Sequence, residues 1–516
     1  MRSMVPPPAP RRVSAHDRAP AGGWALHDSA TARRLEIAAA AGLPPHTLMR
    51  RAGLAVARLA LALAPNTRRV WVAAGPGNNG GDGLEAALHL HHAGKEVVVA
   101  VHPADTRPAD ATAALERARA AGVHLSEQPT PAEPLAPTDL AIDALFGLGA
   151  TRPPRGWALD ALHALGHGGA PVLAIDLPSG LDPDHGRCLA VDATVRARWT
   201  LSLLTLKPGL FTAAGRDHAG AVWFDGLGVP ADTEPPVARL VSAADVAWPA
   251  RHHERHKGSF GDLWVVGGDT GMVGAAVLAA QAGLAAGAGR VYLVALGGGA
   301  IARPEVMTRP PTALSDRQLA LEDATVVCGC GGGAGIAAPL ATLIGRAGRL
   351  LLDADALNAL AADPALALRV QARTQRGRPT LLTPHPLEAA RLLGISAADV
   401  QADRLGAARA LATHLSATVV LKGSGSIVAD ATDCLINTSG NAALAGAGTG
   451  DVLAGWTAGL WSQGLAPRDA AVLGVFSHGT AADRWQAAHG AAAPLPATTL
   501  IESLGQAWGS RPMHGC

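Results

Sequence analysis

The chain has 516 residues, of which 48% are hydrophobic and 16% charged, and its formal net charge is +1. This length allows two to four domains at roughly 150 residues each. The near-neutral charge, with no basic stripe, excludes nucleic acid as an expected partner. No apolar run reaches the ~18 uninterrupted residues of a membrane-spanning helix, so a membrane is not an expected partner either.

The N-terminal segment MRSMVPPPAPRRVSAHDRAPAGG is rich in proline and small polar residues, and it has no apolar stretch followed by a cleavage site. We predict a disordered tail over residues 1–26 and no signal peptide. The five cysteines are few and odd in number. Cys328 and Cys330 are too close together and too isolated for a zinc site. We therefore expect reduced thiols and a cytoplasmic location.

Short apolar runs alternate with helical patterns between residues 27 and 232. The runs are RVWVAAG, EVVVAVH, DLAIDALF, PVLAIDL, TLSLLTL and AVWFDG, at residues 69–75, 96–102, 139–146, 171–177, 200–206 and 221–226. They are continuous and lack polar alternation, which is typical of strands covered by helices on both faces. This part of the chain is predicted to be an α/β domain with a parallel sheet.

A second α/β pattern follows a segment rich in proline and acidic residues, which predicts a linker over residues 233–250. Strand candidates lie at 262–268, 290–296, 324–329, 349–355, 379–385, 417–423 and 426–430, and a helix of small residues is predicted over 274–289. No short repeat relates the two halves. We expect two unlike α/β domains, at residues 27–232 and 251–512.

The first candidate site is AGPGNNGGDG, at residues 74–83, where a strand passes into a helix. Glycine lets the backbone approach a ligand closely, and the N–H groups at a helix start attract phosphate. The segment matches neither the dinucleotide-binding motif nor the P-loop, since no lysine follows. A glycine-rich turn required only by packing is the alternative interpretation.

Two further strand ends carry polar side chains. Asp143 begins DALFGLGATRP, and Asp176 and Ser179 lie in AIDLPSGLDPDHG. Ligands of open α/β sheets bind at the carboxyl ends of strands. An amide, a carboxylate and a hydroxyl that converge there would suit a hard cation, and a carboxylate can act as general acid or base. Each aspartate could instead cap a helix or form a turn.

In chain order, AGPGNNGGDGLEAALHL, DALFGLGATRP, IDLPSGLDPDHG and LKPGLFTAAGRDHAG resemble segments of the NAD(P)H-hydrate epimerase family, over about residues 28–230. The resemblance implies a Rossmann-like three-layer αβα fold. It also implies interconversion of the R and S hydrates of NADH and NADPH (NADHX and NADPHX), with a bound potassium ion.

The resemblance implies Asp176 as the acid/base at the nicotinamide ring, and Asn79, Asp143 and Ser179 as potassium ligands. The residues implied to bind substrate, besides Asp176, are Asn78, Asn79, Gly80, Gly81, Asp82, Gly147, Leu148, Gly149, Ala150, Thr151, Arg152 and Pro153. Lys207 is a second catalytic candidate, or else a surface lysine at a strand end. The helix MRRAG departs from the family pattern, because Arg50 stands where an acidic residue is expected.

The second candidate site is GTGD, residues 448–451, which opens a helix of small residues. N–H groups at such a start can hold a transferring phosphoryl group, and Asp451 can take a proton from an attacking hydroxyl. A glycine-rich turn is again the alternative.

LKGSGSIV brings Lys422 and backbone donors towards a nucleotide. His385 follows a strand, where a core or capping role competes with ligand binding. Asp353 and Asp355 of LLDADALN are further candidates, and a turn-forming role is the alternative for one of them.

The segments HKGSFG, GMVGAA, RPEVM, LLDADALN, TPHPLEAARLLG, LKGSGS and GAGTGDVLAG resemble, in order, the ADP-dependent NAD(P)H-hydrate dehydratase family, over about residues 245–510. The resemblance implies a ribokinase-like αβα fold. It implies that ADP phosphorylates the hydrate hydroxyl, that phosphate is then eliminated to give NAD(P)H, and that AMP is released, with magnesium accompanying the nucleotide.

Carried onto this chain, the resemblance implies Asp451 as the catalytic carboxylate. The residues implied to contact the hydrate are Asp451, Ala275, Gly333 and His385, and those implied to hold the nucleotide are Lys422, Gly423, Ser424, Gly425, Ser426 and Gly450. Two departures stand out. The usual G-P-G-L-G loop reads GCGGG at residues 329–333, and Ser426 replaces the usual threonine.

Together the two halves predict a fused epimerase (isomerase) and dehydratase (lyase) that repairs hydrated NAD(P)H. Its partners would be NADHX, NADPHX and ADP, and we expect a homo-oligomer. One alternative is a ribokinase-like small-molecule kinase with an N-terminal ligand-binding module. The other is a nucleotide-binding scaffold with one decayed site, which only the altered GCGGG loop favours.

Overall fold

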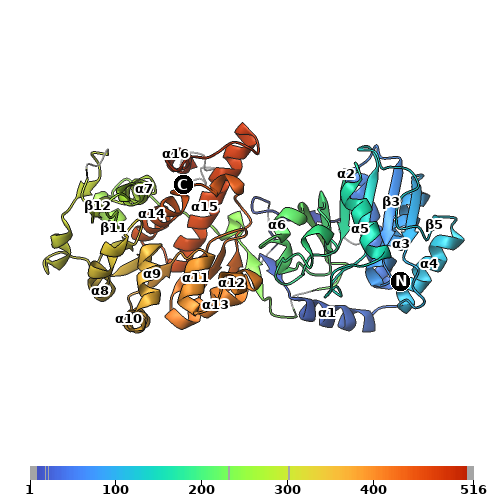
Figure 1. Cartoon of the computed structure of the whole chain (residues 1–516), viewed down its shortest axis with the longest axis horizontal. Coiled ribbons are helices and arrows are strands. Elements are labelled where there is room, and N and C mark those ends of the chain that lie inside the picture. The colour runs from blue at the N-terminus through green and yellow to red at the C-terminus, as the bar shows by residue number, and fades with distance from the viewer. Residues whose placement is uncertain (1–8, 18, 21–22, 231–232, 300–302, 508–516) are drawn as a thin grey trace. The chain divides into compact units, whose positions relative to one another are not determined.

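The computed structural model describes residues 9–17, 19–20, 23–230, 233–299 and 303–507. The chain divides into two compact units, Met1–Arg239 and Leu240–Cys516, and each is described by itself (Figure 1). The boundary falls inside the predicted linker of residues 233–250, within the short strand β10 (Ala238–Leu240). Among the described residues, no helix is long and apolar enough to cross a membrane.

Unit 1 is built on an eight-stranded sheet in the order β1-β9-β8-β7-β6-β3-β4-β5. Its strands are β1 (Arg11–Arg12), β3 (Arg69–Ala74), β4 (Glu96–Val101), β5 (His124–Ser126), β6 (Leu140–Ala144), β7 (Val172–Ile175), β8 (Trp199–Leu203) and β9 (Ala221–Asp225). The neighbouring pairs from β9 to β5 are parallel. The chain runs outward from β3 to β5 and then returns to β6 beside β3. This reversal creates a switch point, where α/β sheets bind ligands.

Helices cover both faces of this sheet. Side chains of β3 alternate between two cores. Val70 and Val72 pack with helices of residues 47–63, 78–92 and 109–120, whereas Trp71 and Ala73 pack with the helix of residues 157–167. Both faces are therefore buried, which explains why the strands read as continuous apolar runs. The helices are α1 (Ser29–Ala41), α2 (Thr47–Leu63), α3 (Asn78–His92), α4 (Ala109–Ala120), α5 (Trp157–His167) and α6 (Gly215–His218). The three-layer αβα arrangement agrees with the predicted class.

Part of the predicted disordered tail is ordered. Strand β1 pairs antiparallel with β9, and a second short strand, β2 (Trp24–Leu26), precedes α1. Val13 and Trp24 are buried, and Trp24 packs edge-to-face on Phe224 with ring centroids 6.0 Å apart. The prediction of disorder is wrong for these residues because the open edge of β9 offers backbone partners that composition does not reveal. Residues 1–8, 18 and 21–22 of the predicted tail lie outside the described residues.

Unit 2 has a mixed sheet that runs β13-β12-β11-β14-β15-β16-β17-β18-β19. These strands are β11 (Asp262–Gly267), β12 (Arg290–Ala295), β13 (Met307–Thr308), β14 (Thr325–Cys328), β15 (Arg349–Leu352), β16 (Thr380–Leu382), β17 (Thr418–Leu421), β18 (Ile427–Ala429) and β19 (Cys434–Ile436). The pairs from β13 to β17 are parallel, and β18 and β19 add antiparallel strands. The loops after β14, β15, β16 and β17 therefore all leave the same edge of the sheet.

Helices α7 (Val273–Ala285), α14 (Thr449–Ser462) and α15 (Pro467–His489) pack on one face of this sheet. The other helices are α8 (Ala337–Arg346), α9 (Asp355–Ala362), α10 (Pro364–Gln375), α11 (Pro386–Leu393), α12 (Ala397–Ala402), α13 (Arg404–Leu415) and α16 (Ala497–Ala507). In Figure 1, α8 and α10 lie on the side of the sheet opposite to α14 and α15. Close packing of α7 on α14 depends on small residues: a Cβ on Gly455 would lie 2.0 Å from the Ala279 carbonyl oxygen.

Candidate active sites

The glycine-rich segment after β3 has both a packing role and an open surface. A Cβ on Gly75 would lie 1.9 Å from the Leu145 carbonyl oxygen, and one on Gly80 would lie 2.0 Å from the Gly75 carbonyl oxygen. These glycines let the loop lie against the end of β6. Gly77, the residue that precedes α3, faces open space instead and provides no side-chain cap. The first N–H groups of α3 are thus available to a ligand.

A cavity of about 640 Å³ opens at the switch point of unit 1. Eight of the predicted substrate residues line it: Asn78, Asn79, Asp82, Gly147, Leu148, Gly149, Ala150 and Asp176. Gly80 and Gly81 lie beneath the surface, where a Cβ on Gly81 would meet the Met49 side chain at 2.4 Å. Thr151, Arg152 and Pro153 are exposed and are not among the lining residues.

Asp176 and Lys207 form a buried ion pair at the floor of this cavity. Asp176 has a left-handed backbone (φ +66°), which aims its carboxylate across the end of β8, and Leu203 N–H donates to Oδ1 at 3.0 Å. Lys207 Nζ contacts the same Oδ1 and donates to the Leu203 carbonyl at 2.8 Å. The Lys207 side chain is only 1% exposed. The interpretation of Lys207 as a surface lysine is therefore wrong.

Asp143 and Ser179 are hydrogen-bonded to each other next to this cavity. Ser179 donates to the two Asp143 oxygens from its backbone N–H (2.7 Å) and its hydroxyl (2.6 Å). Burial raises the pKa of Asp143 to about 6, although the Ser179 bonds oppose the shift. The Asn79 side chain lies against Gly147, and its buried amide nitrogen has no hydrogen-bond partner among the described residues. Asp143 has no ion-pair partner among the described residues, and a buried carboxylate of this kind suits a hard cation, to which the oxygen of the Asn79 amide could add a ligand.

Two further carboxylates face the cavity. Burial, together with the negative charges of Asp176 and Glu36, raises the pKa of Asp82 well above its ordinary value. Burial and the charge of Asp176 also raise the pKa of Glu36 on α1. Sequence reasoning missed Glu36. The available signal was its helical spacing: Ala32, Glu36 and Ala40 lie four residues apart, and all three line the cavity.

The GTGD segment of unit 2 begins α14 at Thr449, directly after Gly448 in the left-handed conformation (φ +84°). No side chain caps this helix start. A Cβ on Gly450 would lie 3.6 Å from Lys422 Nζ, so the lysine ammonium stands beside the first turn of α14. Uncapped N–H groups and an adjacent cation form a favourable environment for a phosphoryl group.

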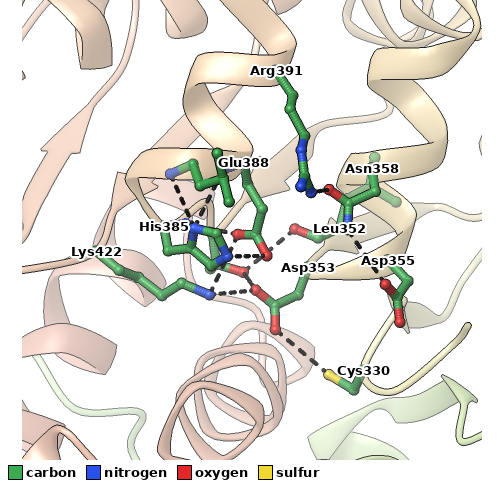
Figure 2. A network of polar contacts seen from close by, with 11 residues as sticks. Cys330, Leu352, Asp353, Asp355, Asn358, His385, Glu388, Arg391 and Lys422 are labelled. Atoms are coloured by element: carbon green, nitrogen blue, oxygen red, sulfur yellow. Dashed lines mark hydrogen bonds and ion pairs between the residues drawn. The ribbon is translucent and has the colours of Figure 1, made fainter. Parts of the chain in front are cut away.

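Lys422 belongs to a polar network that the parallel strands bring together, and Figure 2 shows it. Its Nζ lies 2.8 Å from Asp353 Oδ1, and Thr383 Oγ1 donates to the same oxygen at 2.7 Å. Glu388 Oε2 lies 3.9 Å from Nζ. Burial lowers the pKa of Lys422, but the charges of Asp353 and Glu388 outweigh burial and raise it.

Asp451 lies against Asp353 and the Cys330 thiol. The ligand atoms of the three side chains are all within 4.8 Å of one another. Burial and the neighbouring charge of Asp353 raise the pKa of Asp451 to about 6. A carboxylate with a pKa near neutral can accept a proton and hold it during turnover.

His385 caps α11, as one of its two sequence interpretations predicted. Its Nδ1 accepts from Leu387 N–H (3.1 Å) and Glu388 N–H (3.2 Å), while Nε2 lies 3.1 Å from Glu388 Oε1. Because Nδ1 accepts, the neutral ring carries its proton on Nε2 and donates it to Glu388. Burial and the charge of Lys422 lower the pKa of His385, which favours this neutral form.

The loop after Lys422 is shaped by two glycines with positive φ, Gly423 (+132°) and Gly425 (+67°). The buried Arg404 guanidinium donates to the carbonyls of Lys422 (3.2 Å) and Gly425 (3.3 Å), and Ser426 Oγ donates to the Gly423 carbonyl at 3.2 Å. Ser424, the remaining predicted nucleotide residue here, is exposed. These hydrogen bonds hold the loop in place. The bond of Ser426 within the loop needs only a hydroxyl, so serine can make it as well as the usual threonine.

The altered GCGGG loop packs on the start of α7. A Cβ on Gly331 would lie 2.8 Å from the Ala275 Cβ, so the loop and α7 are in contact. Gly333 has φ +52°, and its N–H donates to Asp355 Oδ2 at 2.8 Å. The two predicted hydrate contacts in this region, Ala275 and Gly333, thus come from neighbouring segments.

Sequence reasoning did not select Glu388 or Cys330 as site residues. The signal for Glu388 was the H-x-x-E spacing from His385, which is a capping-box pattern just after a strand. In the sequence, the C-x-C spacing bears only on a zinc motif. Strand β14 ends at Cys328, so Cys330 lies at the ligand-binding edge of the sheet, and that placement was the usable signal.

Two family models match the chain. Residues 45–209 match "YjeF-related protein N-terminus", and residues 263–505 match "NAD(P)H-hydrate dehydratase". A bifunctional NAD(P)H-hydrate repair enzyme from Escherichia coli K12 is 36% identical over 498 residues, with 93% of each chain covered. One from Moorella thermoacetica is 37% identical over 451 residues, covering 81% of this chain and 83% of that protein.

The chain belongs to the family of bifunctional NAD(P)H-hydrate repair enzymes. It is thus an enzyme with an epimerase part and a dehydratase part, and the small-molecule kinase alternative is set aside. Among solved structures, an ADP/ATP-dependent NAD(P)H-hydrate dehydratase from Bacillus subtilis is 29% identical. The match covers 51% of this chain and 93% of that one, with a TM-score of 0.43.

Proposed function

We propose that unit 2 transfers a phosphoryl group from ADP to the hydroxyl of the S hydrate and then eliminates phosphate. Asp451 takes the hydroxyl proton as the oxygen attacks the terminal phosphorus, and the bond to AMP breaks. The C–O bond then breaks, phosphate leaves, the adjacent carbon loses a proton, and NAD(P)H is restored. The observation that carries this proposal is Asp451 in the uncapped first turn of α14, with a pKa of about 6 and Lys422 beside Gly450.

Other groups in unit 2 bind and orient. Lys422 and the N–H groups of Gly450 and of the loop 422–426 would hold the nucleotide phosphates. His385, Ala275 and Gly333 would contact the hydrate. The Cys330, Asp353 and Asp451 cluster does not fit a magnesium cage, because one donor is sulfur and Asp353 is already paired with Lys422. We propose that magnesium enters on the phosphates of the nucleotide.

In unit 1, we propose that Asp176 is the acid/base that interconverts the R and S hydrates, with Lys207 balancing its charge. Asn78 and Asp82 would bind the substrate, together with the loop 147–150 of the cavity wall. Gly80, Gly81 and the exposed residues 151–153 would act through the backbone shape or by closing on the ligand. Asn79, Asp143 and Ser179 would hold a potassium ion, which supplies positive charge next to the bound hydrate.

The cytoplasm is the proposed compartment. The cysteines of the described part of the chain, Cys188, Cys328, Cys330 and Cys434, are all free thiols, which supports a reducing environment. The homo-oligomeric state stays a prediction.

The test is a turnover assay with a mixed R/S hydrate of NADH, magnesium, potassium and ADP, in which NADH absorbance is followed. The wild-type protein should consume the whole mixture. Asp451→Asn should lower the dehydration rate about 10²–10⁴-fold, the range for loss of a general base, while chromatography still detects exchange of R and S. Asp176→Asn should leave the S fraction reactive and slow the R fraction.

Binding of ADP without recovery of NADH, with either ADP or ATP as donor, would contradict the proposal and favour the scaffold with a decayed site. Full dehydratase activity of Asp451→Asn would contradict only the proposed role of Asp451 and would leave the dehydratase function itself standing.

A further inference from the structure

Arg404, the first residue of α13, lies directly behind the loop 422–426 that the proposed function gives to the nucleotide phosphates. It is buried, with 2% of its surface exposed. Its guanidinium donates to the backbone carbonyls of Lys422 (3.2 Å) and Gly425 (3.3 Å) in this loop. It also donates to the side-chain oxygen of Gln401 at 2.7 Å. The chemistry proposed above assigns no role to this cation.

The two carbonyl bonds of Arg404 fix the direction of N–H groups in the loop. In a planar trans peptide, the carbonyl and the N–H of the next residue point in opposite directions. Because the Lys422 and Gly425 carbonyls point at Arg404, the N–H groups of Gly423 and Ser426 point away from it. A Cβ on Gly423 would lie 2.8 Å from Arg404 Nη1, so the backbone lies on the guanidinium. Gly423 is exposed, which leaves its other side open to a ligand.

Arg404 keeps its positive charge although it is buried. Burial lowers the pKa of its guanidinium to about 10, which is still far above neutral pH. Charges attract each other more strongly away from bulk water, so a buried cation favours an anion nearby. The loop has one cationic side chain of its own, Lys422, and Asp353 already balances its charge at 2.8 Å. A second positive charge behind the loop would thus favour the phosphates of a nucleotide.

We propose that Arg404 is a positioning residue of the nucleotide site, which turns the N–H groups of Gly423 and Ser426 towards the phosphates of a nucleoside diphosphate and places a positive charge behind them. Arg404 acts through the loop, and none of its bonds forms or breaks in the reaction. The inference rests on the proposed function, which assigns the loop 422–426 to ADP.

Arg373 of α10 is a matched control for Arg404 in the same unit. It is also 2% exposed, and burial likewise lowers its pKa to about 10. It donates to the carbonyl of Ile344 (2.6 Å) and to Thr380 Oγ1 (3.0 Å). Strand β16 begins at Thr380, so Arg373 lies at the amino end of a strand, whereas the candidate site lies at the carboxyl ends. The two arginines therefore share burial and type of bonding but differ in their distance from the site.

The first test measures binding of ADP to the full chain by calorimetry, with magnesium present. Arg404→Met removes the charge and releases both carbonyls, so it should weaken ADP binding about 10–100-fold. The KM for ADP should rise in parallel, with much smaller changes in kcat at saturating ADP and in the KM for the S hydrate. Arg404→Lys keeps the charge without the planar fork of donors and should lose an intermediate amount.

Arg373→Met should lower the melting temperature of unit 2 but keep the wild-type affinity for ADP. This outcome separates a role in the nucleotide site from a general loss of stability. Wild-type affinity in Arg404→Met, or an equal loss of affinity in Arg373→Met, would overturn the inference.

The second test needs no substitution. In the wild-type chain, ADP should slow hydrogen exchange in peptides that cover residues 422–428, because N–H groups that donate to phosphate are protected from exchange. Unchanged exchange in these peptides while ADP is bound would overturn the inference, even if the Arg404 variants fail to fold. A wild-type protein that binds ADP with this protection but restores no NADH would instead overturn the proposed function and leave the role of Arg404 standing.

Discussion

Both units place a lysine–aspartate pair at the carboxyl ends of parallel strands, but the lysine stands differently in each. In unit 1, Lys207 contacts Asp176, the proposed acid/base itself. In unit 2, Lys422 contacts Asp353 at 2.8 Å, and Asp451 stands beside the pair. The same two residue types therefore serve two purposes, which a sequence motif does not distinguish.

The difference separates two ways of using a buried carboxylate. The charge of Asp176 is balanced by a cation within contact distance, so its position depends on that cation. Asp451 is instead left with a pKa of about 6, because burial and the charge of Asp353 outweigh the opposing charge of Lys422. We therefore expect the Lys207–Asp176 ion pair to contribute mainly to the stability of unit 1. The Lys422–Asp353 pair does not include the proposed base, and we expect it to affect mainly proton transfer to Asp451 in unit 2.

The largest expected effect is on the stability of unit 1. Lys207→Met should lower its free energy of unfolding by about 3–5 kcal/mol, because the variant leaves the largely buried Asp176 without its cation. Epimerisation should also be lost. Hydrogen exchange of unit 1 peptides in the full chain, followed by mass spectrometry, measures the stability change.

Two variants serve as controls for Lys207→Met. The double variant Lys207→Met/Asp176→Asn removes both charges and should recover much of the lost stability, but not the activity. Lys422→Met should destabilise unit 2 less, since Asp353 keeps the Thr383 and Cys330 donors. Equal losses of stability in Lys207→Met and Lys422→Met would contradict the expectation that the lysine matters more for stability in unit 1 than in unit 2.

The next effect concerns the proposed cation at Asp143. The pKa of Asp143 is raised from 3.8 to about 6 by burial, so the folded state binds a proton more tightly than the unfolded chain. Without a cation, the stability of unit 1 should fall as the pH rises from about 4 to about 6 and then level off. Bound potassium compensates the ionised carboxylate, so stabilisation by potassium should grow through this window and reach about 1–3 kcal/mol near neutral pH.

Thermal melts in potassium chloride and in choline chloride, at equal ionic strength and at two pH values, measure this effect. Asp143→Asn is nearly isosteric and should abolish both the potassium dependence and the pH dependence. Equal stabilisation by potassium at both pH values, or in Asp143→Asn, would mean that the ion binds elsewhere.

Much of the fold was predictable from the sequence because both sheets are buried on both faces, so that strands such as β3 and β15 read as uninterrupted apolar runs. Chain order at strand ends also located Asp143, Asp176 and Lys422. Short edge strands such as β1 were missed, because they are defined by a partner distant in sequence.

The sequence did not reveal which charged side chains contact one another in the two candidate sites. Whether Lys207 is buried, and which aspartate Lys422 contacts, depends on side-chain directions at the sheet edge. Glu36 and Cys330 were missed for the same reason: their neighbours in space come from other segments, and no local pattern marks them.

The smallest effect tests whether His385 serves the helix, the substrate or both. His385→Ala removes the Nδ1 acceptor of two N–H groups at the start of α11 and should cost about 1 kcal/mol, whereas His385→Asn keeps a capping oxygen and should cost only a few tenths. If the ring also contacts the hydrate, both variants should raise KM several-fold with kcat less affected, because neither side chain reproduces the Nε2 donor. Thermal melts and initial rates on the S hydrate separate the two roles. A KM that rises only in His385→Ala would make His385 purely a cap, and the substrate contact in unit 2 would then rest on the loop at Gly333 and on Ala275.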